Sequence, residues 1–326
     1  MNDVQRFDEV KHEQGDGVFR IPPIQFVGEC FKNLTAEERR DWGQVENGVP
    51  EQLLRTRGGG VKVCVCDTGA SQHRDMPDLL FAKNFTGSAT AYDRNGHSTH
   101  VGGTIAARGE FQGIASNCQI GFCKVLGDDG SGSSRGIAAG IDYAVEQGCN
   151  IINLSLGGGY DADTHSAIKR AIAEKCWVFA AAGNSGYNGR NSIGYPGKLK
   201  ETICVASYSS NGDISNFSSG GEQVDIACPG AGILSCWPGD QYRAISGTSM
   251  ATPHAVGLAA LALSIAFDED KRIDTVDDLR NMFREICTDK GAAGFDVRWG
   301  WGVPRAKAII DALADEEKEA DPAWWL

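Results

Sequence analysis

Residues 247–254 (GTSMATPH) place a serine, Ser249, between an expected strand and an almost uniformly apolar segment. A serine hydroxyl is a weak nucleophile, so chemistry at Ser249 needs a base within hydrogen-bond reach and a third group that orients the base. A helix that begins here would point unpaired N–H groups and the positive end of its dipole outward beside the hydroxyl. Serine is also a preferred helix N-cap, and taken alone the stretch favours that structural interpretation.

Two further stretches supply candidate partners for this serine. Asp67 follows an apolar segment, and His97 lies in residues 95–104 (NGHSTHVGGT). The triplet Asp-Thr-Gly at Asp67 also fits an aspartic peptidase, but that site needs two carboxylates that share a proton, and the sequence has no second such triplet. His97 and His100 could share a helix face as a metal-binding pair. The sequence around them has no Cys-x-x-Cys and no third clustered ligand, which disfavours structural zinc.

The elements that must position these side chains alternate along the chain. Short apolar runs bounded by Gly, Asp or Asn predict strands at 61–66, 120–126, 150–156, 176–182, 202–207 and 224–228. Amphipathic helical patterns lie between them, for example at 137–145 and 167–172. Apolar strands that alternate with helices indicate a parallel sheet covered on both faces. We therefore predict a three-layer α/β/α fold with a mostly parallel central sheet, in which ligands bind beyond the carboxyl ends of the strands.

Four motifs occur in the order found in the subtilase family, and the chain resembles that family over about residues 42–310. The motifs are Asp67-Thr68-Gly69, His97-Ser98-Thr99-His100-Val101, Ala181-Ala182-Gly183-Asn184 and residues 247–254. The resemblance implies a subtilisin-like fold and a serine endopeptidase that hydrolyses peptide and protein substrates. A catalytically idle relative that only binds peptides or partner proteins is the alternative.

Positions that match the family motifs imply a role for each residue. Ser249 would attack the peptide carbonyl, and His97 would take the proton from its hydroxyl. Asp67 would orient the imidazole of His97 and stabilise its charged form. Asn184 would donate a hydrogen bond to the developing oxyanion.

The resemblance also implies that an extended substrate binds between two edge segments through main-chain hydrogen bonds that are largely indifferent to sequence. These segments are Gly130, Ser131 and Gly132, and Ser155, Leu156 and Gly157. Ser134 stands where the family often has a bulky tyrosine, which predicts an open pocket for the fourth residue before the cut. The small, uncharged wall at 181–183 predicts an apolar or aromatic residue directly before the cut.

A structural calcium ion is a further implication of the resemblance. Asp225 matches a family carboxylate that binds calcium together with main-chain oxygens near Lys200 and Thr202. Calcium takes roughly six to eight oxygen ligands, so these residues would supply only part of a site. The loop at 108–112 is shorter than the calcium-binding insertion of subtilisin, which disfavours that second kind of site.

Composition shifts divide the chain into an N-terminal extension at 1–41, a peptidase domain at 42–312 and an acidic C-terminal tail at 313–326. Residues 21–23 (Ile-Pro-Pro) favour extended backbone, because proline excludes helix. The short extension resembles that of intracellular subtilisins. This resemblance implies that it lies across the active site as an inhibitory propeptide until it is removed.

Charge and cysteine content bear on partners and compartment. A net charge of -12 argues against nucleic acid and anionic membranes as partners, because both require clustered Lys and Arg on the protein. Residues 1–14 lack the pattern of a signal peptide, and the apolar run at 255–267 is too short to span a bilayer. Eleven cysteines, several within apolar strand patterns, suit a reducing compartment. We predict a cytoplasmic protein, with secretion by a route that uses no recognisable signal peptide as the alternative.

Overall fold

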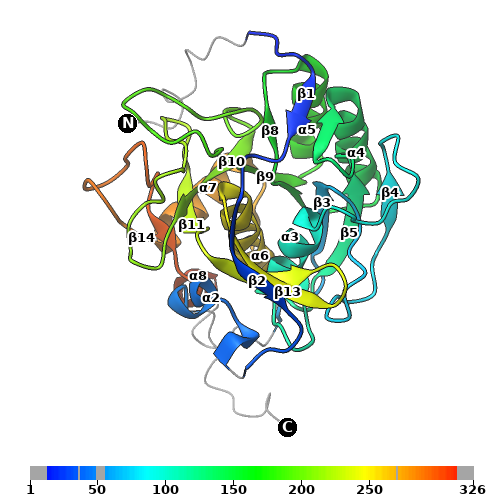
Figure 1. Ribbon diagram of the computed structural model, residues 1–326. Coiled ribbons are helices and arrows are strands. Elements are labelled where there is room, and N and C mark those ends of the chain that lie inside the picture. Colours follow the sequence, from blue (N-terminus) through cyan, green and yellow to red (C-terminus); the bar gives the residue numbers. More distant parts are fainter. Residues whose placement is uncertain (1–12, 36, 49–55, 269–270, 314–326) are drawn as a thin grey trace.

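A seven-stranded sheet with the order β11-β10-β9-β7-β3-β5-β4 forms the centre of the molecule, and its neighbouring strands are parallel. The computed structural model describes residues 13–35, 37–48, 56–268 and 271–313 (Figure 1). The strands of this sheet are β3 (Lys62–Asp67), β4 (Ala82–Asn84), β5 (Gln119–Lys124), β7 (Ile151–Leu154), β9 (Trp177–Ala181), β10 (Thr202–Tyr208) and β11 (Ile226–Pro229). Every residue of β7, β9, β10 and β11 is buried, because helices cover both faces of the sheet.

Two groups of helices form the outer layers. The described helices are η1 (Glu37–Arg39), α2 (Trp42–Glu46), α3 (His97–Ala106), α4 (Ser134–Glu146), α5 (Ala162–Ala173), α6 (Thr248–Asp268), α7 (Val276–Ile286) and α8 (Ala306–Leu313). One apolar core joins the sheet to α3, α6, α7 and α8, and a second core joins it to α4 and α5. The predicted three-layer α/β/α fold is confirmed.

Helix α6 is longer than the apolar run in the sequence suggested. By length and composition its segment Thr248–Phe267 is apolar enough to cross a membrane, but 89% of that segment is buried inside the protein. Its apolar character on all sides follows from its position in the core, where it contacts α3, α8 and the strands β7, β9, β10 and β11.

Three small sheets surround the central one. They are β6 (Ser131–Ser133) with β1 (Val18–Arg20) and β8 (Gly157–Gly158), β12 (Ile233–Trp237) with β13 (Gln241–Ser246) and β2 (Gln25–Phe31), and β14 (Cys287–Thr288) with β15 (Val303–Pro304). The first two sheets each take one strand from the N-terminal segment, which runs in blue across the molecule in Figure 1. Residues 1–12 of the predicted extension, and the predicted tail from residue 314 onward, lie outside the described residues.

Candidate active site

Asp67 and His97 meet at the carboxyl edge of the central sheet. Asp67 is the last residue of β3, and His97 is the first residue of α3. His97 Nδ1 lies 2.8 Å from Asp67 Oδ1 and 2.9 Å from Oδ2, and both side chains are fully buried. The preceding Gly96 has a φ of +101°, and a Cβ there would clash with Trp237. The helix can therefore begin at His97 only because residue 96 is glycine.

The contact with a carboxylate determines which nitrogen of His97 can act as a base. Nδ1 faces Asp67 and donates to it, so the tautomer with its proton on Nδ1 leaves a lone pair on Nε2. Among the described residues, Nε2 has no hydrogen-bond partner although it is buried. An unpartnered nitrogen beside an ordered carboxylate is suited to accept a proton.

Ser249 is the second residue of α6 and is fully buried. Its Oγ donates a hydrogen bond to the main-chain oxygen of Ser155 at 3.2 Å. The hydroxyl of Ser155 in turn donates to the main-chain oxygen of Ser249 at 2.9 Å. This reciprocal pair fixes the start of α6 against the edge segment that precedes β8, and the Ser249 hydroxyl makes no hydrogen bond to His97 Nε2.

Asn184 follows β9, and its amide is held in one orientation. Its Oδ1 accepts hydrogen bonds from the main-chain N and from Oγ1 of Thr248, at 2.9 and 2.8 Å. The amide nitrogen must then face the other way, and it donates to the carbonyl oxygen of Pro23 at 2.6 Å. A peptide carbonyl of the N-terminal segment therefore lies at the predicted oxyanion donor.

Strand β1 of the N-terminal segment lies between the two edge segments predicted to bind substrate. It is antiparallel to both neighbours, with Arg20 opposite Ser131 and Gly157, and with Phe19 opposite Gly132 and Gly158. Past the end of β1, the main-chain N of Ile21 donates to the oxygen of Gly130 at 3.0 Å. Leu156, the remaining predicted residue, turns its side chain into the core and is fully buried.

The register of β1, continued past its last paired residue, places a proline beside the segment that holds Ser249. Arg20 pairs with Gly157 in an antiparallel ladder, so two residues later Pro22 falls opposite Ser155. Proline has no N–H, and it cannot donate to the oxygen of Ser155. That oxygen accepts the hydrogen bond from Ser249 Oγ instead.

Phe19 marks an apolar pocket beside this ladder. Its side chain is 1% exposed and packs in the core that includes α4 and α5. The main-chain N of Ser134, the residue predicted to leave this pocket open, donates to the oxygen of Gly17 at 2.8 Å. The ring of Phe19 therefore lies in apolar surroundings within the protein.

The predicted calcium ligands are occupied by a side chain. Arg280 of α7 donates from Nε to Asp225 Oδ1 at 3.1 Å, and from Nη2 to the main-chain oxygens of Lys200 and, at 2.9 Å, of Thr202. The Arg280 side chain is 2% exposed. The predicted oxygens do converge on a positive charge, but that charge is a guanidinium, so the residues present do not fit a calcium ion as well. No local pattern marks Arg280, because it is 55 residues from Asp225 in the sequence.

A second buried aspartate–histidine pair was not predicted. His254 Nε2 lies 3.1 Å from Asp41 Oδ1, and both side chains are fully buried. Asp41, placed by the sequence at the end of the extension, also caps α2. The capping preference of aspartate was a usable signal for the second role, whereas the pairing depends on residues 213 positions apart.

Comparisons with known proteins agree with this geometry. A sequence model described as the subtilase family matches residues 58–302. The chain is 38% identical over 305 residues to an alkaline protease of Alkalihalobacillus alcalophilus, which covers 92% of this chain and 77% of that protein. It is 41% identical over 255 residues to subtilisin Savinase of Lederbergia lenta, with 77% and 91% covered. It is 43% identical over 232 residues to an intracellular serine protease of Paenibacillus polymyxa, with 67% and 71% covered.

Proposed function

Because the chain belongs to the subtilase family and is a subtilisin-like serine peptidase, we propose that Ser249, His97 and Asp67 are the catalytic triad with which it cleaves peptide bonds. The observation that carries this proposal is the peptide carbonyl of Pro23 on the amide of Asn184, at 2.6 Å. The oxyanion donor already binds the kind of oxygen that the reaction would polarise.

In the proposed mechanism, Ser249 Oγ attacks the substrate carbonyl as its proton passes to His97 Nε2. Asp67 keeps the proton of the imidazole on Nδ1 and stabilises the imidazolium that forms. His97 then donates the proton to the leaving amine, and water releases the acyl group by the same route. Asn184 stabilises the oxyanion, and replacing it with alanine should lower turnover by roughly 10² to 10³, the loss known for subtilisin.

Substrates should bind as β1 does in the structure. A strand that pairs with both β6 and β8 uses main-chain groups, which supports broad specificity. The burial of Phe19 supports a preference for an apolar or aromatic residue at the matching substrate position. The small wall at 181–183 supports an apolar residue directly before the cut.

We also propose that the N-terminal segment is an inhibitor of its own active site. It occupies both edge segments and Asn184, so a substrate must displace it. Pro22 leaves the Ser155 oxygen to accept from Ser249 Oγ, so the hydroxyl donates to Ser155 and not to His97 Nε2. Activation would then require removal of the segment and a rotation of the Ser249 side chain towards His97 Nε2.

Covalent labelling with a fluorophosphonate tests both proposals. A chain that lacks residues 1–32 should be labelled much faster than the full chain, and Ser249→Ala should abolish labelling in both. This truncation keeps Asp41, whose loss would disturb α2 and His254. Equal labelling of the two chains would exclude inhibition, and no labelling of either would favour an idle protein.

A pair of proline substitutions separates the missing N–H from other effects of the segment. Pro22→Ala restores an N–H opposite Ser155 and should speed the labelling of Ser249. Pro23→Ala, the matched control, adds an N–H one position out of register and should change the rate much less. Equal gains from both would assign the effect to a looser backbone.

The compartment also belongs to the proposal. None of the eleven cysteines, all of which lie in the described part of the chain, is in a disulfide. Thiols persist in a reducing compartment, which supports a cytoplasmic location. Formation of disulfides in the purified protein at the redox potential of the cytoplasm would count against this location.

A further inference from the structure

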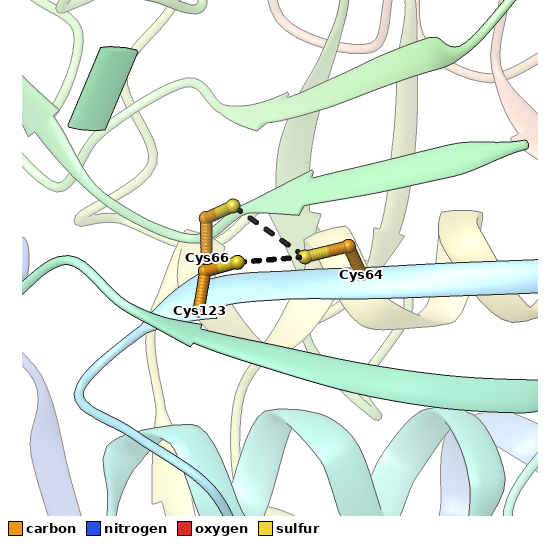
Figure 2. Close-up of side chains that lie close together, drawn as sticks. All are labelled: Cys64, Cys66 and Cys123. Atoms are coloured by element: carbon orange, nitrogen blue, oxygen red, sulfur yellow. Dashed lines mark hydrogen bonds between the residues drawn. The ribbon is translucent and has the colours of Figure 1, made fainter. Parts of the chain in front are cut away.

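Three thiols lie together in the core on the far side of β3 from α3. Cys64 and Cys66 belong to β3 and Cys123 belongs to β5, and all three side chains are fully buried (Figure 2). Cys64 Sγ lies 3.7 Å from Cys66 Sγ and 3.6 Å from Cys123 Sγ. The three sulfurs all lie within 4.8 Å of one another.

The sheet itself brings the three thiols to one place. Cys64 and Cys66 are two residues apart in a strand, so they point to the same face. The parallel register sets Cys66 directly opposite Cys123. All three side chains belong to the apolar core that joins the sheet to α4 and α5. The cluster is therefore fixed by regular backbone and does not depend on a loop.

We propose that Cys64, Cys66 and Cys123 form a binding site for a single thiophilic metal ion of the zinc or copper(I) class. Sulfur ligands select these ions over magnesium, calcium or manganese. With metal–sulfur bonds of about 2.3 Å, a tetrahedral zinc site has sulfur–sulfur edges of about 3.8 Å. The two shorter separations in the cluster are close to this edge, so a metal would need only small side-chain movements.

Binding requires that the ligating thiols lose their protons, which leave as the metal enters. The metal charge then offsets the thiolate charge, which would otherwise be costly in an apolar core. Because the cluster is fully buried, the metal should enter while the chain folds.

A second group of potential ligands shows what distinguishes the thiol cluster. His73, Asp75 and Cys236 are also buried and close together. Their ligand atoms are already used, because His73 Nδ1 accepts from the N of Asp75, and Asp75 Oδ2 accepts from the N of Phe111 and from the hydroxyl of Tyr242. A metal there would break these hydrogen bonds. In the thiol cluster, the two sulfur contacts of Cys64 are to the other two members.

The test uses the full chain with Ser249→Ala, which prevents self-digestion, produced in medium that contains zinc(II) or cadmium(II). After gel filtration we expect about one metal ion per chain by mass spectrometry, and in the cadmium sample a thiolate-to-metal absorption band in the ultraviolet. Cys64→Ala with Cys123→Ala should lose the metal and the band. The matched control, Cys118→Ala with Cys228→Ala, removes two buried thiols outside the cluster and should keep both.

Metal-free protein from either medium would overturn the proposal without reference to any variant. Retention of the metal by the Cys64/Cys123 variant, or its loss from the Cys118/Cys228 control, would also overturn it. Circular dichroism shows whether each variant is folded. If the double variant fails to fold, the single change Cys66→Ala replaces it and should also lose the metal. None of these readouts depends on peptidase activity.

Discussion

Two buried aspartate–histidine pairs in this molecule have nearly the same chemistry and different surroundings. The Asp67–His97 and Asp41–His254 side chains have no solvent exposure, and the nitrogen–oxygen distances are 2.8 and 3.1 Å. In the first pair the far nitrogen of the ring has no partner among the described residues. In the second pair the far nitrogen, Nδ1, lies 2.9 Å from the main-chain oxygen of Met250.

The remaining contacts of Asp41 show a further difference between the two pairs. Asp41 Oδ1 also accepts from the main-chain N of Gly43 and of Gln44, so it ties α2 to the helix that carries His254. Both nitrogens of His254 face oxygen atoms of the protein, Asp41 Oδ1 and the main-chain oxygen of Met250. Neither nitrogen is left open to a substrate. The comparison teaches that a buried aspartate beside a histidine is not enough to predict a catalytic base. The proposed base, His97, differs from His254 in having a second nitrogen without a partner among the described residues.

The two pairs are also linked through α6. His254 and Ser249 are five residues apart in this helix. The Asp41–His254 pair therefore holds the helix whose first turn carries Ser249, the proposed nucleophile. We expect one pair to act on the chemistry and the other on the stability of the element that the chemistry needs.

Removal of each histidine should separate these roles most sharply. In the chain that lacks residues 1–32, His97→Ala should lower kcat on a small chromogenic peptide by about 10⁶, as loss of the histidine does in subtilisin. His254→Ala should leave the kcat of the folded fraction within about tenfold, since that ring does not contact the reacting atoms. Similar losses of kcat in the two variants would break the comparison.

The second expected effect is on stability. His254→Ala leaves the Asp41 carboxylate buried without its partner, and loss of one member of a buried pair costs about 3–5 kcal/mol. Urea unfolding of the Ser249→Ala protein measures this change. Asp41→Asn serves as the companion variant, because it removes the charge and keeps an oxygen for the N–H groups that cap α2. Additive effects of the two changes would show that the pair is not coupled.

The sequence predicted the layers and the principal site residues because those depend on local signals. Apolar runs gave the strands, and Asp67, His97, Asn184 and Ser249 lie in short motifs at strand and helix ends. The edge segments that flank β1 were predicted from the resemblance of residues 130–132 and 155–157 to the edge segments of the family.

What the sequence did not reveal depends on contacts between distant residues. Arg280 comes to Asp225 from a helix whose pattern shows only that it is amphipathic. His254 lies within the serine motif and still gave no sign of its partner, because Asp41 is far away in the chain. The alternate cysteines of β3 were visible, but their position opposite Cys123 requires the register of the sheet.

A third buried histidine sharpens the comparison through pH. Burial lowers the pKa of His100 from 6.5 to about 3, and its Nε2 donates to the main-chain oxygen of Ile233. Because the folded pKa lies below the unfolded one, the unfolded chain binds more protons in between, and stability is lost as pH falls from about 6.5 to 3. At roughly 1.4 kcal/mol per pKa unit, the loss is on the order of a few kcal/mol. Urea midpoints should fall across this range, and His100→Gln should flatten the curve.

The smallest expected effect is the acid dependence of the Asp41–His254 pair itself. Burial alone would raise the pKa of Asp41, but the charge of His254 and the hydrogen bonds from His254 and Gln44 outweigh it and lower that pKa below 3.8. A lowered carboxyl pKa stabilises the fold above about 3.8, and this contribution disappears as pH falls through the folded pKa.

The difference in unfolding free energy between Asp41→Asn and its parent chain should therefore stay constant from neutral pH down to about pH 4 and shrink in stronger acid. Asp213→Asn, in a turn where the carboxylate accepts a hydrogen bond from the amide of Asn211, gives the matched baseline. If the Asp41 difference instead began to shrink near pH 6, the titrating group would be a histidine. The proposed distinction between the two pairs would then rest on position alone.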